Sequence, residues 1–177
     1  MAEIIEGILE KTGGKERSIR WFRQKVKELG EVPSAQLVRE GVVTGRPSYG
    51  KMNFFMYDPK FKDNTKVLPY YDMFPLVLPI ERIPGGFAGI NFHYLRPGAR
   101  FTLLERLQRF STRGREVTSR NSFDVSYNRV RNIPLVKNTI KKYLFNHVRS
   151  NFLRVDYDEA ALAVYLPVAQ FKKGSPY

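Results

Sequence analysis

Between residues 16 and 29, apolar side chains recur at three- and four-residue intervals, while lysine and arginine fill most of the other positions. This spacing predicts an amphipathic helix. Its apolar face consists of Ile19, Phe22, Val26 and Leu29. Residues 3–11 predict a shorter helix of the same kind. Trp21 lies away from the apolar face of the longer helix, so it either packs against a second element or anchors a partner.

The pattern changes between residues 51 and 95, where short apolar runs are separated by glycine and proline. Three strands are predicted, at residues 51–57, 76–80 and 87–95. Pro79 has no N–H group for a ladder hydrogen bond, which favours an edge position or a bulge in the second strand. Together these strands indicate a small curved antiparallel sheet or an SH3-like barrel over residues 49–95.

Helical spacing returns over residues 100–110. One face of this predicted helix carries Phe101, Leu104 and Leu107, and the opposite face carries Arg106, Arg109 and Arg113. Residues 111–133 are polar and rich in arginine, which predicts a long, partly ordered loop. The helix would therefore present a basic face to solvent and an apolar face to the core.

Residues 134–150 predict a second basic helix. Its inner face would consist of Val136, Ile140, Tyr143 and His147. A last helix is predicted over residues 156–166, although residues 161–168 also allow a strand. The tail, residues 172–177, is expected to be loose or to act as a docking peptide.

These patterns predict an α+β fold, with a small curved antiparallel β-sheet or SH3-like barrel flanked by N-terminal and C-terminal helices. We expect three regions along the chain. They are an N-terminal helical region and linker (1–48), a small β core (49–95), and a basic helical region with the C-terminal tail (96–177).

Composition excludes several classes of protein. The 177 residues are 42% hydrophobic and 14% aromatic, which is enough for a core. The absence of cysteine excludes a disulfide framework and a thiolate metal site. No apolar run approaches the roughly 20 residues that cross a membrane, and the N-terminus lacks the basic region of a signal peptide. We therefore expect no membrane partner.

The net charge of +13 is concentrated in one segment of the chain. Residues 96–154 contain fourteen Lys and Arg against three acids, a net charge of +11, whereas residues 1–95 carry fourteen against eleven, or +3. A basic segment beside nearly neutral segments indicates a surface that binds a polyanion.

Most cations of this segment are arginines, whose planar guanidinium groups meet phosphate oxygens with two hydrogen bonds. The candidate nucleic-acid contacts are Arg96, Arg100, Arg106, Arg109, Arg113, Arg115, Arg120, Arg129, Arg131, Lys137, Lys141 and Lys142. The alternative is a solvated basic face, or one that docks an acidic protein neighbour.

The sequence offers little catalytic chemistry. The two histidines, His93 and His147, have no acidic residue at ligand spacing, so both are interpreted as hydrogen-bonded core residues. Asp58, Asp72 and Glu81, all inside the β region, are the candidate carboxylates for a magnesium site of a nuclease, and turn capping or surface pairing explains them more simply. We therefore expect no enzyme activity, no cofactor and no bound metal.

Three segments resemble a known family: Gly50–Lys60, Leu68–Pro79 and Gly86–Pro97. They are similar to the corresponding parts of the DNA end protectors, which are head-completion proteins of T4-like tailed phages. The helix around Ser18–Val26 also looks like the upstream helix of that family. The resemblance implies a structural protein of the virion that binds the ends of packaged DNA and shields them from exonuclease.

The resulting hypothesis is a non-enzymatic phage protein that binds and protects the ends of linear double-stranded DNA through its arginine-rich face. Its other expected partners are phage head, portal or neck proteins, and its expected location is the virion, with host cytoplasm during assembly. The alternative is a neck or baseplate structural protein whose basic face docks an acidic neighbour. A nuclease that uses the three carboxylates is a more distant third reading.

Overall fold

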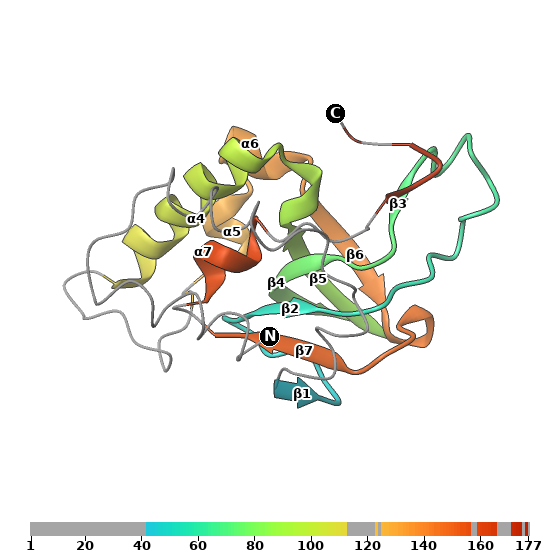
Figure 1. The fold of residues 1–177 in the computed structure, drawn as a ribbon, viewed down its shortest axis with the longest axis horizontal. Helices are drawn as coiled ribbons and strands as arrows, with labels where there is room; N and C mark the ends of the chain where they lie inside the picture. The colour runs from blue at the N-terminus through green and yellow to red at the C-terminus, as the bar shows by residue number, and fades with distance from the viewer. Residues whose placement is uncertain are drawn as a thin grey trace.

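Six antiparallel strands form the main sheet of the protein (Figure 1). The computed structural model describes residues 42–112, 123, 125–156, 159–165, 171–174 and 176. The order across the sheet is β1-β7-β2-β4-β5-β6, which leaves β1 and β6 at its edges. The strands are β1 (Val42–Thr44), β2 (Met52–Phe54), β4 (Leu76–Ile83), β5 (Gly86–Asn91), β6 (Ile140–Leu144) and β7 (Phe152–Val155). A separate two-stranded ladder joins β3 (Tyr71–Asp72) to β8 (Phe171–Lys172).

The strands β4 and β5 form a hairpin at the centre of the sheet. Its turn contains Pro84 and Gly85, and Gly85 has a φ of 70°, which a residue with a side chain rarely adopts. The register shifts between Pro79 and Glu81, so the predicted bulge is present. Because β4 lies between β2 and β5, this bulge is how an interior strand accommodates a proline.

The α-helices gather on one face of the sheet (Figure 1). The longest, α4, contacts η1, α6 and α7. The α-helices are α4 (Pro97–Thr112), α5 (Tyr127–Val130), α6 (Pro134–Lys137) and α7 (Ala160–Ala163), and the 3-10 helices are η1 (Phe92–Tyr94) and η2 (Phe145–His147).

Alternation along the strands divides the core into two clusters, one on each face of the sheet. On β2, Met52 and Phe54 face the helices, and the next residue, Phe55, faces the other way. The helix-side cluster includes Met52, Phe54, Leu78, Ile90, Leu104, Leu107, Val136 and Leu153. The aromatic cluster on the opposite face consists of Phe55, Val77, Phe87, Tyr143 and Phe152.

The α+β class with an antiparallel sheet is confirmed, and the sheet is open rather than a closed barrel. The predicted helix over residues 134–150 is wrong. Only α6 is helical there, and Ile140–Leu144 forms β6, which pairs with β5 along five residues. The apolar positions of this segment fit both periods, and pairing with the buried strand β5 decides between them. Strands from both ends of the described chain therefore extend the sheet beyond residues 49–95.

Other differences concern the ends of elements. The segment interpreted as a loop, residues 111–133, contains the last two residues of α4 and the short helix α5. Within the predicted helix 156–166, α7 covers Ala160–Ala163. The start of the tail pairs with β3 through β8. The predicted helices 3–11 and 16–29, together with Trp21, lie outside the described residues.

Candidate nucleic-acid interface

The outer face of α4 presents Arg106 and Arg109, both exposed to solvent. They lie one helical turn apart, on the side opposite the buried Leu104 and Leu107. Leu103, also buried, widens the apolar stripe. The sequence therefore predicted the orientation of this helix correctly. Two guanidinium groups are held on a rigid element whose other face packs into the helix-side cluster.

Four more of the predicted contacts are exposed, and each comes from a different segment. Arg96 precedes α4, Arg131 follows α5, Lys137 ends α6, and Lys142 lies on the edge strand β6. Among the described residues, no carboxylate forms an ion pair with any of these six exposed cations. Among the described residues, no carboxylate therefore neutralises their charge.

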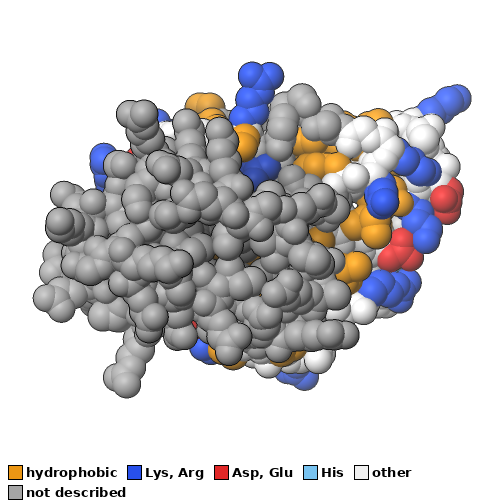
Figure 2. All heavy atoms as spheres, in the orientation of Figure 1, with side chains coloured by type: hydrophobic (Ala, Val, Ile, Leu, Met, Phe, Trp, Pro, Cys, Tyr) orange, Lys and Arg blue, Asp and Glu red, His pale blue; other side chains and the backbone are white. Residues whose placement is uncertain are grey.

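A second group of cations is already neutralised by acids. In the loop after β2, Lys62 pairs with Asp58 at 2.9 Å, and the carboxylate of Asp58 also lies 3.7 Å from Arg149. Blue and red side chains lie side by side at the right of Figure 2, over this loop. The Lys62 hydrogen bond lowers the pKa of Asp58. This mixed surface contrasts with the exposed cations of α4 and its neighbours, which pair with no carboxylate of the described residues.

Lys141 is half-buried rather than fully exposed. Its ammonium group lies 4.1 Å from the centre of the Tyr94 ring, a cation–π contact. Burial lowers the pKa of Lys141 and raises that of Tyr94. The ammonium group of Lys141 thus already interacts with another residue of the protein.

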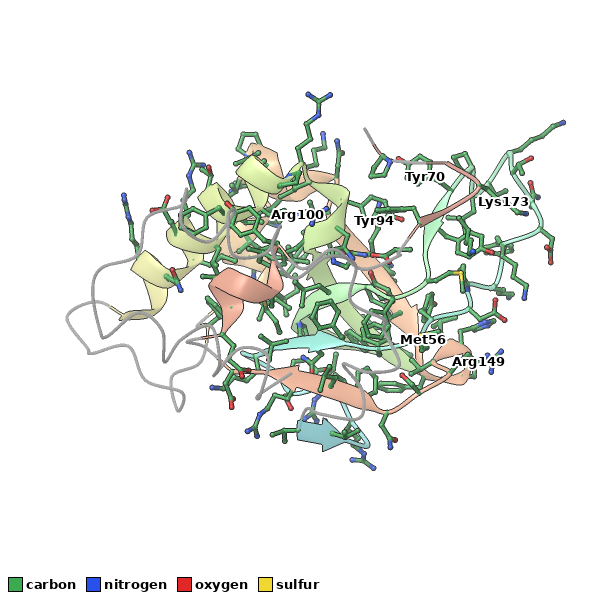
Figure 3. All side chains as sticks on the ribbon, in the orientation of Figure 1. Met56, Tyr70, Tyr94, Arg100, Arg149 and Lys173 are labelled. Atoms are coloured by element: carbon green, nitrogen blue, oxygen red, sulfur yellow. The ribbon has the colours of Figure 1, made fainter. Side chains whose placement is uncertain are left out.

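Arg100 is a correction to the predicted phosphate contacts, because only 4% of it is exposed. Its Nε donates to the carbonyl oxygen of Leu95 at 2.7 Å, and its Nη1 donates to that of Val164 at 3.1 Å. Figure 3 shows its label between α4 and the sheet. Arg100 lies on the inner side of α4, so its guanidinium satisfies carbonyl groups where the helix meets the segment after α7.

Four other predicted contacts receive no structural account. Arg113, Arg115 and Arg120 lie outside the described residues, and only the backbone of Arg129 is described, in α5.

Asp72 lies at the centre of a buried hydrogen-bond network. Its Oδ1 accepts from the N–H of Phe74 at 3.1 Å, and its Oδ2 accepts from Asn91 Nδ2 at 2.9 Å and from His93 Nδ1 at 3.0 Å. Burial lowers the pKa of His93, and the Asp72 charge opposes this shift by less, so the ring is neutral. The interpretation of His93 as a core histidine is confirmed. His147 is only half-buried, with its Nδ1 at 2.8 Å from the carbonyl oxygen of Asp58.

The three carboxylates considered for a nuclease have separate surroundings. Asp72 is buried in its network, Asp58 pairs with Lys62, and Glu81 is exposed on β4. Within the described part of the chain, no group of three or more His, Asp or Glu residues is arranged to hold a metal ion. The same residues contain no helix that is both long and apolar enough to span a bilayer.

The fold and the exposed cations together define a class: a small α+β protein with a basic surface on its helical layer. The chain belongs to the family described as Phage T4 terminal DNA protecting protein, whose model matches residues 5–177. This match confirms the resemblance to DNA end protectors. Comparisons with curated proteins and with solved structures give no match.

Proposed function

We propose that this protein binds the ends of linear double-stranded DNA in a phage and protects them from exonuclease without cutting them. Membership of a family of terminal DNA protecting proteins carries the proposal. The exposed Arg106 and Arg109 on α4 supply the chemistry, and the engagement of Asp72 inside the core is consistent with a role other than catalysis.

An end protector has to bind whatever sequence the genome ends with. Phosphate contacts meet this requirement, because they position a protein on DNA without reading bases. Arg106 and Arg109 lie on one face of a 16-residue helix, and Arg96, Arg131, Lys137 and Lys142 add charge around it. If about five of these cations each neutralise one phosphate, the logarithm of the affinity falls with the logarithm of salt concentration at a slope of about −4 to −5.

The proposal extends to the place of action. The protein acts in the virion, with head, portal or neck proteins as neighbours, after assembly in the host cytoplasm. Gel filtration of disrupted particles, followed by immunodetection of this chain, would show whether it is a virion component.

The direct experiment incubates the purified protein with linear duplex DNA and a processive exonuclease at low salt. We expect the digestion rate to fall as the protein concentration rises. Arg106→Glu with Arg109→Glu should weaken protection and flatten the salt slope by about two. The matched control, Lys60→Glu with Lys66→Glu, makes the same change in net charge on the loop after β2 and should retain protection.

Two outcomes would overturn the proposal. One is unprotected DNA at every protein concentration. The other is normal DNA binding by the α4 variant together with failed particle assembly, which would mean that the basic face docks an acidic protein instead. Magnesium-dependent nicking by the wild type, lost in Asp72→Ala, would contradict the non-enzymatic part.

A further inference from the structure

A cleft of about 510 Å3 lies where three segments far apart in the sequence meet. The first runs from Gly45 to Tyr49, after β1, and the second is the β4–β5 turn region from Arg82 to Gly86. The third runs from Phe145 to Phe152, through η2 into β7. The volume falls within the ~300–1,000 Å3 typical of small-ligand sites.

The cleft lies on the face of the sheet that α4 does not cover. Its wall includes Phe152, which is only 2% exposed and belongs to the aromatic cluster. The cations of α4 belong to a helix that packs on the helix-side cluster, which lies on the opposite face of the sheet from the cleft. The cleft is therefore a site separate from the basic surface of the helices.

Two aromatic rings border the cleft and stay accessible. Tyr49 is 36% exposed and Phe145 is 46% exposed. Phe145 is held from behind, since its ring centre lies 5.9 Å from that of Phe87 and its N–H donates to the carbonyl oxygen of Gly85 at 2.9 Å. Accessible rings with a fixed backbone are suited to stacking with a flat ligand.

Two arginines complete the lining, Arg46 and Arg82. The guanidinium carbon of Arg82 lies 5.3 Å from the centre of the Tyr49 ring, which fixes its position at the mouth. In the described part of the chain, neither arginine has a carboxylate within ion-pair distance. The cleft thus combines aromatic faces with two exposed guanidinium groups.

We infer that this cleft binds one unpaired nucleotide of a DNA strand, with its base against Tyr49 and Phe145 and its phosphate against Arg46 and Arg82. A stacked base, a phosphate and a cleft of this size match the chemistry of a nucleotide better than that of an acidic peptide, which has no obligatory flat group. A base inside a duplex cannot enter, because both of its faces are already stacked. The inference rests on the proposed function and deepens it: the cleft takes an unpaired strand, which only a DNA end or a gap offers.

The experiment measures binding of the full-length protein to two probes by fluorescence anisotropy at low salt. One probe is labelled tetrathymidylate, which has only unpaired nucleotides, and the other is a labelled, covalently closed circular duplex, which has no ends. The variants are Phe145→Ala, Arg46→Gln with Arg82→Gln, and Gly45→Leu, which adds an apolar side chain to a residue that lines the cleft without changing charge. An ideal Cβ at Gly45 has no atom within 4 Å, so this variant should fold normally. Equal melting temperatures check this.

We expect each cleft variant to weaken tetrathymidylate binding about tenfold and to leave binding of the circular duplex unchanged. Arg106→Gln with Arg109→Gln should show the reverse preference and weaken binding of the circular duplex. Unchanged tetrathymidylate affinity in Gly45→Leu and Phe145→Ala would overturn the inference. Loss of both probes in every variant would do so too, because the cleft would then have no separate ligand.

Failure of the proposed function has a different signature. In that case the wild type neither binds the circular duplex nor protects linear DNA, whatever the cleft variants do to tetrathymidylate.

Discussion

One arginine and one phenylalanine on each side of the main sheet have contrasting surroundings. On the face covered by helices, Arg100 is buried and donates to backbone carbonyls, and Phe54 is fully buried and stacks on Phe74 at 5.1 Å. On the other face, Arg82 and Phe145 remain exposed beside a cleft.

This difference shows that the role of an arginine or phenylalanine is set by what covers it. Where α4 and α7 close over the sheet, a guanidinium must satisfy carbonyl groups, because burial without partners is costly. Where no described element covers the sheet, the same group keeps its donors available to a ligand.

The largest loss of stability should come from removing a large side chain on the face of the sheet that the helices cover. We expect Phe54→Ala to lower the free energy of unfolding by about 3–5 kcal/mol, because it leaves a cavity in the helix-side cluster. Phe145→Ala, on the face of the sheet that carries the cleft, should lower the free energy of unfolding by about 1 kcal/mol or less. Urea denaturation followed by circular dichroism measures both. Equal losses would show that Phe145 is packed as tightly as Phe54.

The next effect concerns the two arginines. Arg100→Met should destabilise the protein by about 2–4 kcal/mol, because the carbonyl groups of Leu95 and Val164 lose a buried donor. Arg82→Met should cost about 1 kcal/mol at most, since Arg82 is exposed and its interactions with Tyr49 are at the surface. Thermal melts of the pair test this contrast, and a small loss for Arg100→Met would contradict the structural role assigned to it.

A smaller effect depends on pH and involves the buried His93. In the unfolded chain its imidazole titrates near 6.5, and burial lowers the pKa in the folded chain. Below about pH 6.5 the unfolded state therefore binds more protons than the folded state, and stability falls as the pH is lowered. We expect a slope of up to about 1.4 kcal/mol per pH unit, the value for one proton, which disappears in His93→Gln. A slope that persists in this variant would assign the effect to another group.

The smallest effect should come from the cleft itself. Gly45→Ala should change the free energy of unfolding by no more than about 0.5 kcal/mol, because nothing lies within 4 Å of the added Cβ. Gly86→Ala is the opposite case, since its Cβ would overlap the carbonyl oxygen of Tyr143. Chemical denaturation of both variants gives the comparison, and a large loss in Gly45→Ala would mean that the cleft is filled in solution.

Local sequence patterns were sufficient to predict the helix α4 and the turn and bulge of the β4–β5 hairpin. The apolar spacing of Leu104 and Leu107 placed Arg106 on the outer face, and glycine with proline marked the turn and the bulge. Local patterns were insufficient to predict the strand β6. Val136, Ile140 and Tyr143 fit the period of one long helix as well as they fit the observed short helix and strand.

The residues of the candidate sites were also predictable from the sequence only in part. Counting charge by segment selected Arg106 and Arg109, which are exposed, but it also selected Arg100, which is buried, because a sequence does not show which arginine contacts the segment after α7. It passed over Arg46 and Arg82, which lie in the nearly balanced part of the chain. No local signal joins them to Phe145, which is about a hundred positions away from Arg46.

The sequence by itself determined the α+β class, the central hairpin, the amphipathic helix and the excess of positive charge. These depend on side-chain spacing within one segment, on backbone preferences of glycine and proline, and on composition. Only the tertiary structure decided that residues 140–144 form an edge strand, that Arg100 is buried, and that Arg46, Arg82 and Phe145 share a cleft. Those outcomes depend on contacts between segments far apart in the chain, where burial and pairing outweigh local preference.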